Sequence, residues 1–344
     1  MEKIRVLIVD DSLLFRNILS KELKEEQDIE VVGVAVDPMD ALEKIKIFNP
    51  DILTLDIEMP KMNGLTFLKK LMDEKPMKVV LVSSMKITVF DALQTGAVDF
   101  VKKPDMSSKD DLQIFFRELK SKIKIAAIAK LKVNPINKNI ETTKLIITSK
   151  QKIIAIGAST GGTEATLEIL KKLPKDTPPI LITQHMPAGF TKMYADRLNR
   201  VCELEVREAK NMDRLQKGLA LVAPGDNQMK LLKDEKGYYV TCNKGEKVSG
   251  HCPSVDVLFD SVAEVAGKNA IGIILTGMGK DGAQGLIKMK TKGAYTIGQD
   301  KDSSVVYGMP MVAFNIGAVM IQASCENIAD IIIKHLNNQN KIKD

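Results

Sequence analysis

Apolar residues in the first third of the chain form short runs that are separated by longer amphipathic stretches. Five of these runs predict buried strands, because nearly every position in them is apolar: 4–9, 31–35, 51–55, 78–83 and 97–102. Apolar residues at helical spacing predict helices between them, at 12–26, 39–48, 64–74 and 86–96. Strands that alternate with helices in this way predict a parallel sheet covered by helices on both faces.

A second alternation of strands and helices begins at Ile153. Apolar runs predict strands at 152–157, 179–184, 270–277 and 294–298, and helical spacing predicts helices at 163–173, 190–201, 254–267 and 283–293. Between residues 218 and 241, turn residues separate short alternating runs, which is typical of β-hairpins. We therefore predict a second doubly wound, mainly parallel α/β domain that includes a β-hairpin region.

The stretch between the two alternations is of a different kind. A helical pattern over 109–131 is followed by a polar, Pro-broken stretch rich in Lys, Asn and Thr. The chain has 344 residues, which is more than one hydrophobic core usually spans. We predict a first domain over residues 1–125, a linker over 126–150 and a second domain over 151–340.

Composition narrows the classes of function. Aromatic residues make up 4% of the chain and Trp is missing, which argues against a base-stacking platform for nucleic acid. The formal charge of +6 is modest for this length, and the four cysteines form no C-x-x-C pair. The N-terminus lacks the apolar core of a signal peptide, and no apolar run is long enough to span a bilayer. We expect a cytoplasmic protein without membrane insertion.

The carboxyl ends of the strands predicted in the first domain carry, in chain order, Asp10, Asp11, Asp56, Ser83 and Lys103. Parallel sheets of this class place their sites at that edge. Three carboxylates that meet there repel one another unless a cation neutralises them, and Mg²⁺ prefers such oxygen ligands. A carboxylate shielded by a metal can attack a phosphoryl donor, and a lysine can neutralise the transferred group. The alternative is that these acids only cap helices, but their placement at separate strand ends favours a site.

These residues resemble the receiver domain of two-component response regulators, over about the first third of the chain. The resemblance rests on the stretches VLIVDDS, LDIEMPKMNGL, VSS and KKP. It implies a flavodoxin-like fold that is phosphorylated on Asp56. The roles that it implies are Mg²⁺ binding by Asp10, Asp11, Asp56 and the backbone carbonyl of Glu58, and switching by Ser83, Phe100 and Lys103.

The stretch IIAIGASTGGTEA, which begins at Ile153, predicts a strand, a glycine-rich turn and a helix start. It contains the pattern G-x-S-x-G, in which a serine nucleophile is exposed on a sharp turn. A dinucleotide-binding loop would need glycine at position 159, where the backbone approaches a pyrophosphate, but this chain has Ser159. A phosphate-binding loop of the Walker type would need a Gly-Lys-Ser/Thr sequence, which does not follow. We therefore interpret Ser159 as a nucleophile.

A nucleophilic serine requires a base, and the chain contains three histidines. His335 belongs to an amphipathic C-terminal stretch, for which we expect a solvated position, and His251 lies in a loop before a helix. His185 directly follows the strand predicted at 179–184. The chain order of α/β-hydrolases would instead select His335 with Asp281. Triads occur in unrelated chain orders, so we assign the base by placement, to His185.

Asp281 lies on the glycine-rich turn after the strand predicted at 270–277 and could be a simple helix cap. Ser159, His185 and Asp281 all follow strands, however, and this common placement favours a catalytic triad. The backbone N–H groups of Thr160 and Met278 are the expected donors to an oxyanion.

The second half of the chain resembles the catalytic domain of the chemotaxis protein-glutamate methylesterase family. The resemblance rests on IGASTGGTEA, QHMP, CPSVDVLFDS, LTGMGKDGAQGL and SVVYGMP, and with the receiver it covers nearly the whole chain. It implies a serine hydrolase that removes methyl groups from glutamates of chemoreceptors as methanol, and that also deamidates receptor glutamine. It also implies a chemotaxis histidine kinase as phosphoryl donor, and triad positions at Ser159, His185 and Asp281.

The sequence departs from the family pattern at Cys252, where a basic residue is frequent, and at Gln228, where histidine is frequent. Neither departure touches the triad positions, but both leave the substrate range open. The competing interpretation is a non-enzymatic or DNA-binding response regulator, since receivers are joined to many outputs. The second half shows no helix-turn-helix pattern and no basic recognition helix, so we expect no nucleic-acid partner.

Overall fold

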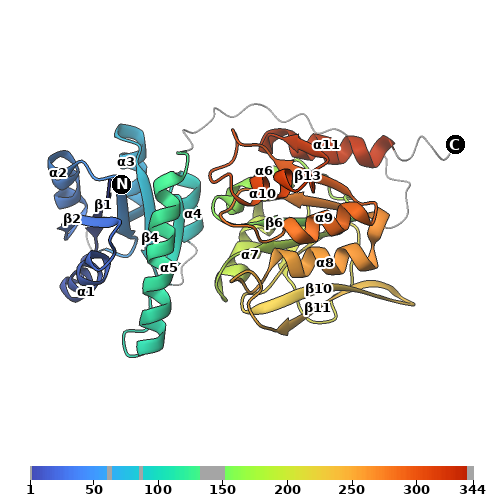
Figure 1. The fold of residues 1–344 in the computed structure, drawn as a ribbon, viewed down its shortest axis with the longest axis horizontal. Coiled ribbons are helices and arrows are strands. Elements are labelled where there is room, and N and C mark those ends of the chain that lie inside the picture. Colours follow the sequence, from blue (N-terminus) through green and yellow to red (C-terminus); the bar gives the residue numbers. More distant parts are fainter. Residues whose placement is uncertain (1, 60–63, 85–87, 132–151, 339–344) are drawn as a thin grey trace. The chain divides into compact units, whose positions relative to one another are not determined.

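A computed structural model describes residues 2–59, 64–84, 88–131 and 152–338. The chain divides into two compact units, residues 1–136 and 137–344. Each unit is an α/β structure with its own sheet (Figure 1). Among the described residues, no helix is long and apolar enough to cross a membrane.

Unit 1 contains a five-stranded sheet whose order is β2-β1-β3-β4-β5, with every neighbouring pair parallel. This order is that of flavodoxin-like folds, as the sequence predicts. The strands are β1 (Ile4–Val9), β2 (Ile29–Ala35), β3 (Ile52–Asp56), β4 (Lys78–Ser83) and β5 (Asp99–Lys102). The helices are α1 (Leu13–Lys24), α2 (Pro38–Phe48), α3 (Gly64–Glu74), α4 (Thr88–Thr95) and α5 (Lys109–Ile128).

The boundary between the units differs in detail from the sequence pattern. Helix α5 continues to Ile128, so the domain end predicted at residue 125 falls inside this helix. Ser108 caps the start of α5, since its side chain accepts a hydrogen bond from the N–H of Asp111. Most of the predicted linker, residues 132–150, lies outside the described residues, and the proposed domain limits remain predictions.

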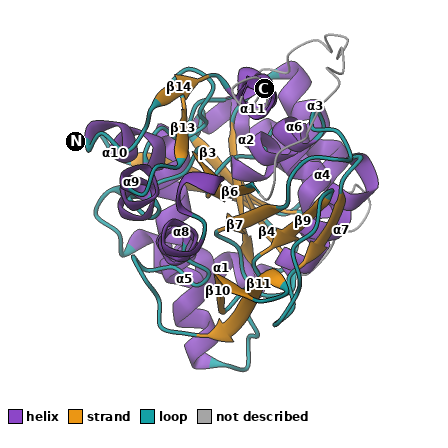
Figure 2. Ribbon diagram, turned by 90° about the vertical axis from the view of Figure 1, so that its right-hand side faces the viewer, coloured by secondary structure: helices purple, strands orange, loops and turns teal. Residues whose placement is uncertain are grey.

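Unit 2 contains a seven-stranded sheet in the order β14-β13-β12-β6-β7-β9-β8, again with parallel neighbours. Its strands are β6 (Ile153–Ala158), β7 (Ile180–Gln184), β8 (Glu205–Glu208), β9 (Leu219–Val222), β12 (Ala270–Ile274), β13 (Tyr295–Gln299) and β14 (Ile321–Ala323). Its helices are α6 (Gly162–Leu170), α7 (Phe190–Val201), α8 (Val255–Val265), a short 3₁₀ turn η1 (Gly267–Asn269), α9 (Ala283–Thr291), α10 (Met309–Asn315) and α11 (Cys325–Asn338). The predicted second α/β domain is thus confirmed. In Figure 2, β6, β7 and β9 run next to one another among the surrounding helices.

The hairpin prediction for residues 218–241 is correct only in part. Strands β10 (Asn227–Asp234) and β11 (Gly237–Lys244) form an antiparallel hairpin that is a separate two-stranded sheet. Strand β9 instead joins the main sheet between β7 and β8 and runs parallel to both. All four residues of β9 are buried, and such a continuous apolar run is typical of a central parallel strand.

Besides the 3₁₀ turn η1, three further elements were not predicted from the sequence. They are β8, β14 and α10, which contain four, three and seven residues. The two strands are short edge strands, with exposed residues within them, so they lack the apolar runs that identified the central strands.

Close packing brings the start of α8 against the end of β6. Gly157 lies in β6, and a β-carbon built there would lie 2.1 Å from Cγ1 of Val255, the first residue of α8. The side chain of Val255 is fully buried, so it occupies the space that a larger residue at position 157 would need. The small residue before Ser159 therefore permits α8 to approach the carboxyl edge of the sheet.

This packing predicts a size-dependent loss of stability. We expect Gly157→Ala to lower the free energy of unfolding by about 1–3 kcal/mol, since the overpacked methyl group forces neighbouring groups to move. Denaturant unfolding of the full chain would measure it. Val255→Ala removes the atoms that clash, so the double variant should be more stable than the sum of the two single changes. If the two losses of unfolding free energy were strictly additive, the contact with Val255 would not be what restricts the size of the residue at position 157.

Candidate active site

Unit 1 brings three predicted residues into direct contact at the carboxyl edge of its sheet. Lys103 Nζ lies 2.7 Å from Asp56 Oδ2 and 3.0 Å from Asp10 Oδ2. Both carboxylates are almost completely buried, and Lys103 is partly buried. Burial raises the pKa of Asp56, and Lys103 opposes that effect without cancelling it. One lysine therefore does not offset the cost of holding this carboxylate ionised.

Asp11 completes an acidic cluster with these residues. One carboxylate oxygen from each of Asp10, Asp11 and Asp56 lies within 4.8 Å of the others, an arrangement that could hold a metal ion. An all-carboxylate donor set of this size suits Mg²⁺, which binds through a few carboxylates and keeps several waters. The three predicted carboxylate ligands thus fit the ion that the sequence resemblance implies.

The remaining predicted residues of unit 1 are Glu58, Ser83 and Phe100. Glu58 donates its backbone N–H to Asp56 Oδ1 at 2.9 Å. Ser83 ends β4, next to β3, and its Oγ donates to the carbonyl of Ser84 at 2.9 Å. Phe100 is buried and packs edge-to-face against Phe90, with 6.4 Å between ring centroids. Its ring therefore lies inside the domain in this conformation.

In unit 2, Ser159 and His185 follow neighbouring strands at the same level. Ala158 of β6 pairs with Gln184 of β7, and the two candidate residues come directly after this pair. His185 donates its backbone N–H to the carbonyl of Ala158 at 3.1 Å, and Gln184 Nε2 donates to the carbonyl of Ser159 at 2.9 Å. Since neighbouring strands lie about 4.8 Å apart, the two residues are next to each other.

A tight turn presents Ser159, which is only partly buried. Gly161 has a left-handed backbone conformation with φ of +77°, which side chains other than glycine rarely adopt. Gly277, in the turn after β12, approaches so closely that a β-carbon there would lie 2.6 Å from Ser159 Cβ. The glycines of the sequence pattern thus let two turns meet at the serine.

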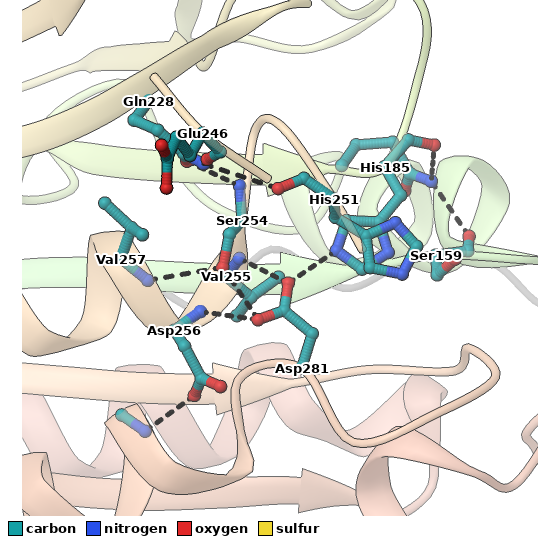
Figure 3. Close-up of polar contacts among 12 residues, drawn as sticks. Ser159, His185, Gln228, Glu246, His251, Ser254, Val255, Asp256, Val257 and Asp281 are labelled. Atoms are coloured by element: carbon teal, nitrogen blue, oxygen red, sulfur yellow. Dashed lines mark hydrogen bonds and ion pairs between the residues drawn. The ribbon is translucent and has the colours of Figure 1, made fainter. Parts of the chain in front are cut away.

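His185 forms a short hydrogen bond with Asp281. The distance from His185 Nε2 to Asp281 Oδ2 is 2.7 Å, and the exposed fractions of the two side chains are 6% and 1%. The other ring nitrogen, Nδ1, is buried and has no hydrogen-bond partner among the described residues. In the view of Figure 3, Ser159 lies at the end of the ring away from Asp281. Nδ1 is therefore the ring atom that remains available to take a proton.

Asp281 is held at the N-terminus of α8 by three donors besides His185. Ser254 Oγ donates to Asp281 Oδ1 at 2.8 Å, Val255 N–H to Oδ2 at 2.7 Å and Asp256 N–H to Oδ1 at 3.0 Å. Burial alone would raise the pKa of Asp281, but the hydrogen bond and charge of His185, with these N–H groups, lower it to about 2. Asp281 is consequently a carboxylate throughout the pH range in which a histidine titrates.

His251, to which the sequence assigns no role, contacts His185. The ring of His251 stacks on the ring of His185, with 3.6 Å between centroids and 7° between planes. His251 lies in a loop and does not follow a predicted strand, so the sequence pattern did not indicate this contact.

The expectation of a solvated His335 is wrong. Its ring stacks on Tyr295 at 3.9 Å, and burial together with nearby Lys152 lowers the pKa of His335 to about 4. The amphipathic pattern placed this residue near the polar side of α11, but Tyr295 at the start of β13 covers it. The histidine that contacts Asp281 directly is His185.

One of the two predicted oxyanion donors, Thr160, belongs to the turn of Ser159, and the other, Met278, belongs to the turn after β12. Met278 is 43% exposed, and no described residue accepts a hydrogen bond from its N–H. Thr160 is buried, and its carbonyl accepts a hydrogen bond from Thr276 Oγ1 at 3.0 Å. Thr276 lies between the end of β12 and Met278. Its hydrogen bond therefore joins the turn that carries Met278 to the turn that carries Ser159.

Comparison with known proteins agrees with this division. The family model for the response regulator receiver domain matches residues 6–113, and the model for the CheB methylesterase matches residues 154–332. The first implies the usual Mg²⁺ site of receivers, for which the acidic cluster is suited. A crystal structure of the Thermotoga maritima CheB methylesterase catalytic domain is 37% identical, with a TM-score of 0.53. The match covers 54% of this chain and 100% of that domain.

Relatives match over nearly the full length. The protein-glutamate methylesterase/protein-glutamine glutaminase 2 of Syntrophomonas wolfei is 52% identical over 342 residues, which cover 98% of this chain and 99% of the relative. The corresponding protein of Sulfurimonas denitrificans is 47% identical over 352 residues, with 98% and 99% covered. The chain therefore belongs to the CheB methylesterase family and carries a response regulator receiver domain before its methylesterase domain.

Proposed function

We propose that the chain is a cytoplasmic, phosphorylation-activated protein-glutamate methylesterase that acts on methylated chemoreceptors. The same site would also deamidate receptor glutamine. The observation that carries this proposal is the buried His185 Nε2–Asp281 Oδ2 contact of 2.7 Å, beside a serine whose turn adjoins it. That arrangement supports general-base activation of a hydroxyl for attack on a carboxylic ester or amide.

In this mechanism Asp281 orients the ring of His185, and Ser159 Oγ gives its proton to His185 Nδ1 while it attacks the carbonyl carbon of the ester. The oxygen that becomes negative is stabilised by the N–H groups of Thr160 and Met278. His185 then returns the proton to the leaving methoxide, which departs as methanol. A water then attacks the acyl-enzyme and gives a proton to the same nitrogen, which returns it to Ser159 Oγ as the acyl bond breaks. The released glutamic acid side chain ionises to the carboxylate. From glutamine, ammonia departs in place of methanol.

The receiver site supports regulation by a phosphoryl group. We propose that Asp56 accepts it from a chemotaxis histidine kinase. Asp10, Asp11, Asp56 and the carbonyl of Glu58 would hold Mg²⁺, which when bound neutralises the charge that the transferred group brings. Lys103 would shift its ion pair from Asp56 to the phosphoryl oxygens. Ser83 would bind the phosphoryl group, and the ring of Phe100 would respond to that movement.

Removing the nucleophile is the first test. We expect Ser159→Ala to reduce methanol release from methylated receptor membranes by roughly 10⁴-fold or more, because no acyl-enzyme can form. Phosphorylation of Asp56 should continue at the normal rate, which provides the control for folding of unit 1. Turnover close to that of the unchanged chain would remove Ser159 from the mechanism.

The choice of base is tested by two matched histidine changes. We expect His185→Gln to lower kcat/KM by roughly 10³-fold or more, since glutamine cannot take the serine proton. His335→Gln changes a histidine that is likewise stacked and partly buried, and it should lower thermal stability while leaving kcat/KM unchanged. The reverse ranking in methanol-release assays would assign the base to His335.

Activation is tested with a small-molecule phosphoryl donor and Mg²⁺. The full chain should hydrolyse receptor methyl esters faster after phosphorylation, and a tenfold rise corresponds to a population shift of about 1.4 kcal/mol. Asp56→Asn keeps the size of the side chain but cannot be phosphorylated, so its rate should stay at the basal level. Equal rates for the phosphorylated, unphosphorylated and Asp56→Asn chains would exclude regulation through this aspartate.

A further inference from the structure

A second buried carboxylate, that of Asp256, contacts the segment that carries Asp281. Its backbone N–H donates to Asp281 Oδ1 at 3.0 Å, and its own Oδ1 accepts from Gly285 N–H at 2.7 Å (Figure 3). The residue is 9% exposed. Neither the sequence motifs nor the mechanism described above assigns it a role.

The contacts of Asp256 and Asp281 are reciprocal. Asp281 comes from the turn before α9 and accepts hydrogen bonds at the N-terminus of α8, whereas Asp256 comes from α8 and accepts one in the first turn of α9. Helix α9 begins after Gly282, which has no side chain to cap it. Asp256 of α8 therefore provides the oxygen that accepts a hydrogen bond from the first turn of α9, as a local capping residue would. Each helix start thus binds a carboxylate of the other, and the pair fixes the Asp281 turn against α8.

This arrangement has an electrostatic cost that capping alone does not explain. Burial raises the pKa of Asp256 to about 6; the Gly285 N–H opposes this rise, while the neighbouring carboxylates of Asp281 and Asp260 add to it. The pKa of Asp256 in the folded chain lies above its ordinary value of 3.8. The protonated carboxyl therefore stabilises the fold below pH 3.8, and this stabilisation is lost as the pH rises through about 6. An asparagine would accept the same hydrogen bond without this cost.

The charged groups that face Asp256 show which of them its negative charge can affect. Asp260 lies one turn later on α8 and pairs with Lys288 of α9 at 2.7 Å, so Lys288 has a nearer partner than Asp256. The remaining neighbour is Asp281, whose other oxygen binds His185. A negative charge behind Asp281 favours the protonated ring that forms when His185 takes the serine proton.

We propose that Asp256 is a positioning residue of the active site, which fixes the Asp281 turn through the reciprocal caps and stabilises protonated His185 by its charge. This inference rests on the proposed role of His185 as the base. Asp256 contacts no substrate or reacting atom in this scheme, so its effect should appear in kcat and in the pH profile and not in KM.

The test compares the full chain with Asp256→Asn and Asp260→Asn, which each remove one negative charge from α8. For Asp256→Asn we expect the acidic limb of kcat/KM to move to lower pH by roughly half a unit to one unit, a three- to tenfold change in proton affinity. KM should stay unchanged, and stability at pH 8 should not fall. Asp260→Asn, whose side chain is 41% exposed and paired with Lys288, should leave the profile close to that of the unchanged chain, since it acts on His185 only through the pKa of Asp256.

A second readout needs no substrate. The chain has only three histidines, so ring signals of ¹⁵N-labelled protein can be followed by NMR and assigned with His335→Gln and His185→Gln. The titration midpoint of the His185 ring should move to lower pH in Asp256→Asn and not in Asp260→Asn. Because this shift does not depend on ester hydrolysis, it separates a failure of the proposed activity from a failure of the role of Asp256.

Superimposable activity profiles and ring titrations for the unchanged chain, Asp256→Asn and Asp260→Asn would overturn the proposal. Should Asp256→Asn not fold, the unchanged chain decides the question. Its His185 ring signals should then show a second inflection at the pH where the Asp256 carboxyl carbon titrates, near 6. A single inflection would refute the electrostatic role.

Discussion

The contact on which the candidate active site depends is the binding of the Asp281 carboxylate at the N-terminus of α8. Two backbone N–H groups, the Ser254 hydroxyl and the ring of His185 converge on it, and the hydrogen bond and charge of His185, together with the two N–H groups, keep the carboxylate ionised although it is buried. An ionised Asp281 holds His185 by Nε2 and leaves Nδ1 toward the serine side. If Asp281 were not bound there, its turn, the orientation of the His185 ring and the capped start of α8 would all lose a hydrogen-bond partner.

The parallel sheet supplies the rest of the geometry. Pairing of Ala158 with Gln184 makes Ser159 and His185 neighbours without any contact between their side chains being required. Strand β12 lies on the other side of β6 and brings the turn that carries Met278 against Ser159. The topology thus gathers residues from three strand ends, and the glycines allow their turns to approach one another.

Fold class and most of the candidate site could be predicted because they depend on local patterns. Apolar runs identified the central strands, and placement at strand ends selected Ser159, His185 and Asp281. The stacking of His251 on His185 and the covering of His335 by Tyr295 are contacts between segments distant in the sequence, which no local pattern encodes. The same reason hid the parallel pairing of β9 and the contact of Asp256 with α9.

Both units hold buried carboxylates close together, and each offsets their repulsion differently. In unit 1 the acids share one lysine, which leaves the pKa of Asp56 raised and the cluster suited to a divalent cation. In unit 2 burial raises the pKa of Asp256 to about 6, whereas the hydrogen bond and charge of His185, with backbone N–H donors, overcome burial and lower the pKa of Asp281 to about 2. A site that recruits a cation can respond to phosphorylation, whereas one fixed by helix N-termini and a histidine is already organised for proton transfer. In the proposed function, the regulatory and the catalytic unit therefore differ in how each one compensates its buried negative charge.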